Sequence, residues 1–199
     1  MHLQLPEIIG FVAGVACVLL GMYEKVWNWP VGIASNVALF ILFRRNGVYA
    51  ASGLQLLYVA IALYGWWNWV RGGDEGGKLR ITRAGASHRL LLLGAVGGGA
   101  VVLHWILARF TNTTVAWPDA IGTSLLLAAQ YCLSRKLLEC WYFWTVADVI
   151  YIALYLSKGL YLTPGLYLFF LGMCVLGFSR WRREAHGSNN LETARAPAS

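Results

Sequence analysis

Residues 139–158 read ECWYFWTVADVIYIALYLSK, an apolar run of helix length with an acid near its middle. On a helix with 3.6 residues per turn, one face of this run collects four aromatic rings and that acid, namely Trp141, Trp144, Asp148, Tyr151 and Tyr155. A carboxylate at the centre of a membrane costs roughly 2.5–3.5 kcal/mol on insertion scales, so it normally faces a cavity or a partner. We therefore interpret Asp148 as a functional residue; the alternative is a structural hydrogen bond to another helix.

The composition around this run predicts a membrane protein. Of the 199 residues, 58% are hydrophobic and 13% are charged, and the mean hydropathy is +0.57. An ordinary soluble domain is about 25% charged. Because one membrane-spanning helix needs roughly 17–25 apolar residues, the chain has room for about seven helices and short loops, without a separate soluble domain. The predicted fold class is an all-α integral membrane protein with seven transmembrane helices.

The apolar runs and the charges between them predict a topology. The spans lie at about residues 6–23, 28–45, 48–70, 89–110, 117–134, 140–157 and 161–179. Most Lys and Arg then fall on the side of the C-terminus, which predicts a periplasmic N-terminus and a cytoplasmic C-terminus. This loop bias also explains the net charge of +7, so no nucleic-acid partner is expected. Residues 71–89 are predicted to form a flexible basic linker, and the polar tail from Glu184 is predicted to be disordered.

A gapless shift of 112 positions superimposes the first part of the chain on the last part. The identical pairs include Pro6 and Pro118, Trp29 and Trp141, Gly65 and Gly177, and Trp69 and Trp181. We interpret the two parts as parallel three-helix repeats separated by one helix, a 3+1+3 arrangement. The predicted divisions are residues 1–74 for the first repeat, 75–112 for the linker and connecting helix, 113–185 for the second repeat and 186–199 for a disordered cytoplasmic tail.

The same shift indicates where a site would lie. It places Asn36 over Asp148, so that each repeat has a polar side chain in the middle of an equivalent helix. Substrate sites in transporters built from repeats lie near the bilayer midplane at the repeat interface, and this pair is therefore the leading polar anchor. Gln55 and Gln130 are further amides in apolar helices; each binds either a substrate or another helix.

Other functional classes find little support in the sequence. The four cysteines form no CxxC motif and the four histidines are scattered, so neither a metal site nor a cofactor is expected. The chain contains no GxSxG or HExxH motif, and an enzyme is not predicted. A proton-coupled pump would carry several buried acids or bases, whereas Asp148 stands almost alone, which favours passive transport. A non-transporting assembly subunit or sensor is the alternative from a different class.

Several motifs together resemble the PnuC family of bacterial vitamin transporters. They are WxxWxxxD from Trp141, KGLY at 158–161, MYEKVWNWPVGI at 22–33, YGWWNW at 64–69 and LSRKLLECW at 133–141. The resemblance implies an inner-membrane homotrimer with the 3+1+3 repeat plan of SWEET sugar facilitators. It further implies uptake of nicotinamide riboside by facilitated diffusion, for pyridine nucleotide salvage, with a cytoplasmic kinase that traps the substrate by phosphorylation.

The resemblance also implies a set of site residues, with Trp141, Trp144 and Asp148 lining the pocket. Together with the repeat, it gives these candidate substrate-binding residues: Trp29, Asn36, Gln55, Gln130, Trp141, Trp144, Asp148, Tyr151 and Tyr167. The chain departs from many nicotinamide riboside transporters of the family, which have Asn at the positions of Asp148 and Leu176. Thiamine and riboflavin, which other family members carry, therefore remain alternative substrates. The expected partners are a vitamin with a cationic aromatic ring and the lipid bilayer.

Overall fold

The computed structural model describes residues 5–72, 79–110, 116–159 and 162–195, and this part of the chain is almost entirely helical. Its seven helices are α1 (Leu5–Met22), α2 (Asn28–Arg45), α3 (Tyr49–Arg71), α4 (Ala86–Phe110), α5 (Ala116–Ser134), α6 (Glu139–Ser157) and α7 (Leu162–Arg195). They coincide with the seven predicted spans within a few residues, except at the end of α7. The last two residues of the KGLY motif and residues 73–78 of the predicted linker lie outside the described residues.

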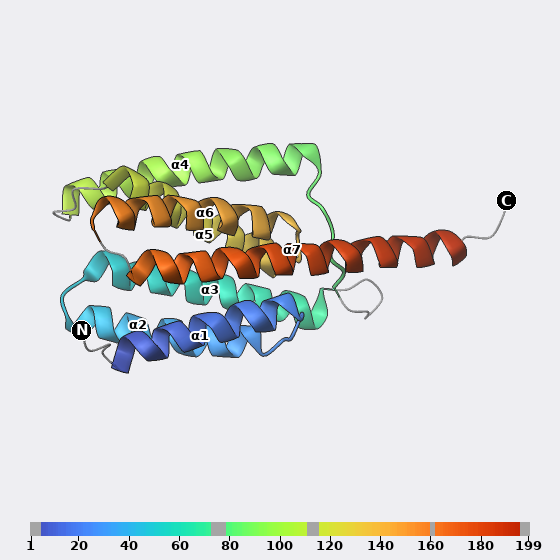
Figure 1. The fold of residues 1–199 in the computed structure, drawn as a ribbon, viewed down its shortest axis with the longest axis horizontal. Helices are drawn as coiled ribbons and strands as arrows, with labels where there is room; N and C mark the ends of the chain where they lie inside the picture. The colour runs from blue at the N-terminus through green and yellow to red at the C-terminus, as the bar shows by residue number, and fades with distance from the viewer. Residues whose placement is uncertain (1–4, 73–78, 111–115, 160–161, 196–199) are drawn as a thin grey trace.

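Six of the helices form a closed ring. Contacts run from α1 to α2, α3, α5, α6 and α7 and back to α1, whereas α4 packs outside the ring, chiefly against α5. Figure 1 shows the helices side by side with α4 at one edge of the bundle. Among the described helices, α3, α4, α6 and the part of α7 from Pro164 to His186 are long and apolar enough to cross a membrane. The outer faces expose large apolar side chains, as lipid contact requires.

Helix α7 differs from its prediction because it is much longer than a membrane span. It continues beyond Glu184 to Arg195, so residues 184–195 are helical where the sequence analysis predicts disorder. Arg180 and Glu184 form an ion pair of 3.1 Å one turn apart, which supports the helix where the apolar run ends. In Figure 1 this part of α7 extends beyond the other helices. Residues 196–199 lie outside the described part of the chain.

The segment 79–85 is attached to the α5–α6 turn, which corrects the prediction of a flexible linker for these residues. The Thr82 amide donates to the Lys136 carbonyl and the Leu138 amide donates to the Thr82 carbonyl, both at 3.0 Å. The Ala84 amide donates to Glu139 Oε2 at 3.1 Å, and Arg89 Nε donates to Glu139 Oε1 at 3.0 Å. The buried Glu139 carboxylate therefore ties the linker to the start of α6.

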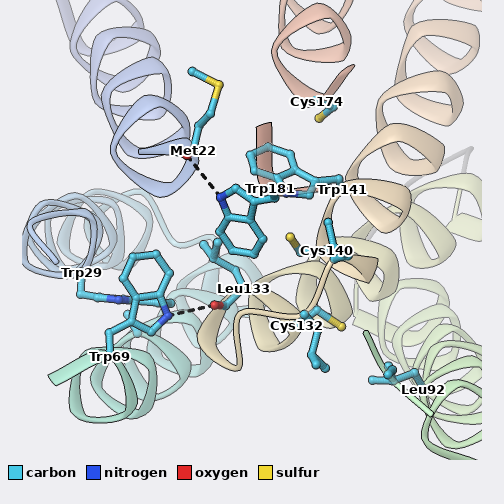
Figure 2. Close-up of a cluster of buried hydrophobic side chains, with 14 residues drawn as sticks. Met22, Trp29, Trp69, Leu92, Cys132, Leu133, Cys140, Trp141, Cys174 and Trp181 are labelled. Atoms are coloured by element: carbon cyan, nitrogen blue, oxygen red, sulfur yellow. Dashed lines mark hydrogen bonds between the residues drawn. The ribbon is translucent and has the colours of Figure 1, made fainter. Parts of the chain in front are cut away.

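Two matching aromatic clusters, 112 positions apart, join the helices at one end of the ring (Figure 2). In each, one tryptophan packs on a glycine and meets a second tryptophan edge-on. The members are Trp29, Gly65 and Trp69 in the first cluster and Trp141, Gly177 and Trp181 in the second. The ring centroids are 5.3 Å and 5.5 Å apart, at interplanar angles of 88° and 89°. A Cβ atom at either glycine would overlap with the tryptophan ring, so both positions require glycine.

Each cluster donates one hydrogen bond to the other half of the chain. Trp69 Nε1 donates to the Leu133 carbonyl at 3.0 Å, and Trp181 Nε1 donates to the Met22 carbonyl at 3.2 Å. Figure 2 shows both bonds as dashed lines. The acceptors lie in the last turns of α5 and α1, where a helix leaves carbonyl groups without partners of its own. The two halves are thus bonded to each other by reciprocal contacts.

The two halves of the chain also correspond in their backbone conformation at the helix ends. The only non-glycine residues with positive φ in the described part of the chain are Glu24 (52°) and Lys136 (50°), which are 112 positions apart. Gly47 (75°) and Gly159 (69°), also 112 positions apart, follow the ends of α2 and α6. Glycine is the usual residue in this left-handed conformation after a helix. A non-glycine residue there carries a strain of order 1–3 kcal/mol, so Glu24 and Lys136 call for an explanation beyond the turn.

Candidate functional site

The ring encloses a chamber of about 360 Å³, lined by all six of its helices. The polar side chains in its wall are Asn28, Ser35, Asn36, Tyr58, Gln130, Asp148 and Tyr167, and the large aromatic ones are Trp29, Trp144 and Phe170. A chamber of this size that combines aromatic walls with a few polar groups is typical of a small-molecule site. It lies between the two halves of the chain, with lining residues from α1, α2 and α3 and from α5, α6 and α7.

Most of the predicted site residues meet in this chamber. Asn36 of α2 and Asp148 of α6, the pair that the repeat superimposes, both line it. Four other candidates join them, namely Trp29, Gln130, Trp144 and Tyr167. They come from α2, α5, α6 and α7, so that segments more than 130 residues apart in the sequence contribute to one wall.

Asp148 dominates the electrostatics of the chamber. Among the lining residues that the structure describes, it is the only Asp, Glu, Lys, Arg or His. Its side chain is buried, and the Cys174 thiol, a weak donor, lies 3.6 Å from Oδ2. A buried carboxylate without a cationic partner is costly, because neither water nor an opposite charge compensates for its own charge. The chamber is therefore suited to a ligand that brings a positive charge.

Three of the predicted site residues, Trp141, Gln55 and Tyr151, are not part of the chamber wall. Trp141 is fully buried between Gly177 and Trp181, and its ring meets Trp144 at 5.3 Å. Gln55 is buried but is not part of the lining. The helical stripe from Trp141 to Tyr155 is about 21 Å long at 1.5 Å per residue. Only its middle, with Trp144 and Asp148, faces the chamber.

Tyr151, the third of these residues, supports the wall from behind. Its ring stacks on that of Tyr167, with centroids 5.2 Å apart, and Tyr155 stacks on Tyr167 at 5.8 Å. The Tyr151 hydroxyl lies 3.3 Å from Thr123 Oγ1, so the ring is held on both sides. Tyr167, which does line the chamber, is thereby fixed in position. Tyr151 is expected to act through Tyr167 rather than by direct contact.

Several lining residues were absent from the predicted set. Tyr58 and Phe170 both line the chamber, and they are 112 positions apart, so the repeat could have identified them as a pair. Cys17 and Cys174 also line it, although no sequence pattern distinguishes either of them as a cysteine that faces a cavity. The Trp29 Nε1–H group is buried without a hydrogen-bond partner among the described residues, which leaves a donor beside the chamber.

Several known proteins are similar to this chain in sequence or in fold. Residues 4–183 match the family described as nicotinamide mononucleotide transporter. The riboflavin/roseoflavin transporter RibM of Streptomyces davaonensis is 26% identical over 203 aligned positions, covering 99% of this chain and 93% of RibM. The nicotinamide riboside transporter PnuC of Escherichia coli K12 is 25% identical over 205 positions, covering 90% of this chain and 85% of PnuC. The crystal structure of the vitamin B3 transporter PnuC superimposes with a TM-score of 0.68 at 20% identity, covering 89% of this chain and 80% of that one.

Helices able to span a membrane, arranged in a ring around a chamber, are typical of a multi-pass membrane transporter, and the related sequences carry the names of transporters. The chain belongs to the nicotinamide mononucleotide transporter family, whose match covers nearly its whole length. The predicted resemblance to PnuC proteins is confirmed at the level of the family and the fold.

Proposed function

We propose that this protein carries nicotinamide riboside across the membrane by facilitated diffusion, with a cytoplasmic kinase trapping the substrate. The observation that carries the proposal is the Asp148 carboxylate, which lines the chamber together with the Trp144 ring and is the only charged side chain in the described lining. Nicotinamide riboside has a flat pyridinium ring with a permanent positive charge. The E. coli relative is named as its transporter. The related proteins are transporters by name, and no enzymatic activity is proposed for this chain.

The chamber offers a partner for each part of this substrate. Asp148 would compensate for the pyridinium charge, and the rings of Trp144 and Tyr167 would stack against its face; such a cation–π contact is worth about 0.5–2 kcal/mol. The amides of Asn36 and Gln130 both donate and accept hydrogen bonds, which suits ribose hydroxyls. Trp29 Nε1 supplies one further donor. Trp141, Tyr151 and Gln55 would hold these groups in place from behind.

We further propose that α1–α3 and α5–α7 are parallel repeats in a 3+1+3 arrangement, with α4 as the connecting helix. Support comes from the matched tryptophan–glycine clusters and from the matched positive φ angles, all at the same offset of 112 positions. The ring contacts are consistent with this symmetry, because α3 meets α5 as α7 meets α1. Alternating access would then follow from movement of one repeat against the other around the chamber.

The setting of the protein is proposed from charge and surface. The excess of Lys and Arg in the loops on the side of the C-terminus supports an inner-membrane protein with a periplasmic N-terminus and a cytoplasmic C-terminus. A homotrimer is proposed in addition. The outward face of α4 is broad and apolar enough for contacts between copies, with exposed Leu90, Leu91, Leu93, Val101, Val102 and Trp105.

Riboflavin is one alternative substrate, because RibM is similar over nearly the whole of both chains. Thiamine is another, since it has a cationic aromatic ring that Asp148 would accept. The charge of the ligand separates these candidates physically. Neutral riboflavin would leave Asp148 without a counter-charge in the chamber, whereas either cationic vitamin would provide one.

A calorimetric screen of the purified protein against nicotinamide riboside, thiamine and riboflavin tests the proposal. We expect nicotinamide riboside to bind most tightly and riboflavin most weakly, and proteoliposomes to show saturable uptake of the labelled nicotinamide riboside. Tighter binding of riboflavin would reverse the substrate assignment. Failure of a broad vitamin panel to bind or to cross the membrane would favour the non-transporting subunit or sensor.

The transport mechanism has its own expected result. Because Asp148 is the only acid in the described chamber wall, we expect no coupling to protons. Uptake of nicotinamide riboside into sealed vesicles should therefore keep its rate when an uncoupler collapses the proton gradient. The same vesicles should equilibrate the vitamin rather than concentrate it. Uptake that stops on addition of the uncoupler would refute facilitated diffusion.

A further inference from the structure

The turns that end α1 and α5 place an ion pair between the two halves of the chain. Lys136 Nζ donates to Glu24 Oε2, and the two residues are 112 positions apart, so equivalent positions supply opposite charges. The Lys136 side chain is only 6% exposed and that of Glu24 is 28% exposed. Because the Lys136 side chain is almost fully buried, separating the pair requires its ammonium group to be hydrated or to find a new partner.

The backbone indicates that the charges, rather than the turns, explain these two residues. Glu24 and Lys136 each adopt the left-handed conformation in the hydrogen-bonded turn that closes a helix. The matching bonds run from the Lys25 amide to the Leu20 carbonyl and from the Leu137 amide to the Cys132 carbonyl. Glycine is preferred at such a position, and at the ends of α2 and α6 this chain uses it. A strained residue where glycine would serve points to a function of its side chain.

The Glu24–Lys136 pair lies beside the tryptophan cluster at one end of the chamber. Lys136 Nζ lies 4.7 Å from the centroid of the Trp69 ring, which meets the ring of Trp29 in the chamber wall. Trp69 also bonds the carbonyl of Leu133, another lining residue. Burial alone would raise the pKa of Glu24, but hydrogen bonds with Glu184 and Lys136 and the positive charges of Lys136 and Arg180 lower it overall. Glu24 is therefore ionised at neutral pH.

We propose that the Glu24–Lys136 ion pair is the gate that closes this end of the chamber and separates when the chamber opens to the side carrying the C-terminus. The inference rests on the proposed transport function. The pair lies at the end of the ring where Trp181 bonds the Met22 carbonyl and from which α7 extends. The neighbouring bonds of Trp69 and Trp181 use backbone acceptors, whereas the pair is an ionic contact between the halves.

The native Cys17 and Cys174 thiols report gate opening without any substrate, because both line the chamber. The experiment uses the full chain in proteoliposomes with a charged, membrane-impermeant thiol reagent added on the side of the C-terminus, and mass spectrometry assigns the label to each cysteine. Glu24→Gln and Lys136→Gln each remove one charge. We expect either variant to raise the labelling rate on the order of tenfold, the size of effect that 1–2 kcal/mol produces. The charge exchange Glu24→Lys with Lys136→Glu should return labelling towards the wild-type rate.

Two further variants separate gating from folding. The double variant Glu24→Gly with Lys136→Gly relieves the strain of both turns while removing the pair, so it should label rapidly while its thermal stability is kept. Arg89→Gln breaks the 3.0 Å ion pair to Glu139, which joins α4 to α6 rather than the two halves of the ring, and should label at the wild-type rate. Wild-type labelling in both single Gln variants and in the double glycine variant would overturn the gate.

The labelling readout stays informative if the substrate assignment fails. Rapid labelling of the variants without uptake of nicotinamide riboside would support the gate and reject the vitamin. Conversely, vitamin uptake that is normal in every variant, together with unchanged labelling, would support the proposed function and reject the gate. The reagent is also added on the opposite side of the membrane. If the variants raised the labelling rate equally from both sides, a gate at one end would be contradicted.

Discussion

Asp148→Ala is expected to weaken the binding of nicotinamide riboside strongly. The variant removes the only charge that the described chamber wall offers to a cationic ring. Loss of a charge-assisted contact of this kind costs about 2–3 kcal/mol, which corresponds to a roughly 30- to 150-fold higher Kd. Isothermal titration calorimetry of the purified variant measures this change directly. Asp148→Asn, which keeps the shape and hydrogen-bonding capacity but not the charge, should give an intermediate loss.

Asp148→Ala should leave the fold intact or stabilise it. Asp148 is buried, and its described side-chain contact is with a weak thiol donor, so its removal relieves a desolvation penalty. A melting temperature equal to or above that of the wild type, combined with weaker binding, would identify Asp148 as a residue retained for function. Unchanged affinity in Asp148→Ala would assign this acid to packing.

Gly65→Ala and Gly177→Ala are each expected to destabilise the protein. A methyl group at either position would overlap with the buried ring of Trp29 or Trp141. Overpacking of this kind costs about 1–3 kcal/mol, because the ring or the backbone must shift. Thermal denaturation in detergent should show a lower midpoint for both variants, and the two decreases should be similar because the clusters are equivalent.

Other glycines in the same helices provide the comparison for these variants. No atom lies within 4 Å of a Cβ built at Gly53 of α3 or at Gly172 of α7. Alanine at these positions should therefore be neutral or stabilise slightly, by about 0.5–1 kcal/mol through its higher helix propensity. If Gly65→Ala and Gly177→Ala melted at the same temperature as these controls, the tight contact between glycine and tryptophan would be refuted.

The helices were predictable because they depend on local properties. Each span is a continuous apolar run, and its length is set by the thickness of a membrane. That Asn36 and Asp148 line the same chamber followed from a gapless repeat, which transfers the position of one side chain to the other half. A single buried acid in an apolar helix was sufficient to identify the polar centre of the chamber.

The remaining features depend on contacts that a linear pattern does not contain. Trp141 and Trp144 share one helical stripe, but Trp141 packs on Gly177, 36 positions later, and only Trp144 reaches the chamber. The attachment of segment 79–85 depends on hydrogen bonds to the α5–α6 turn and to Glu139. The Gly-rich, basic composition of this region does not predict these bonds. The extension of α7 was missed because polar composition alone suggested disorder.

The two hydrogen bonds to Glu139 bear on which helices would move together during transport. Ala84 and Arg89 fasten the beginning of α4 to α6, and α4 also packs along α5. Under the proposed repeat arrangement, α4 would therefore move with α5 to α7, and α1 to α3 would form the other moving part. In an assembly that docks through the outer face of α4, the larger part would be the anchored scaffold. The conformational change of transport would then be a movement of α1 to α3, which each copy would make independently.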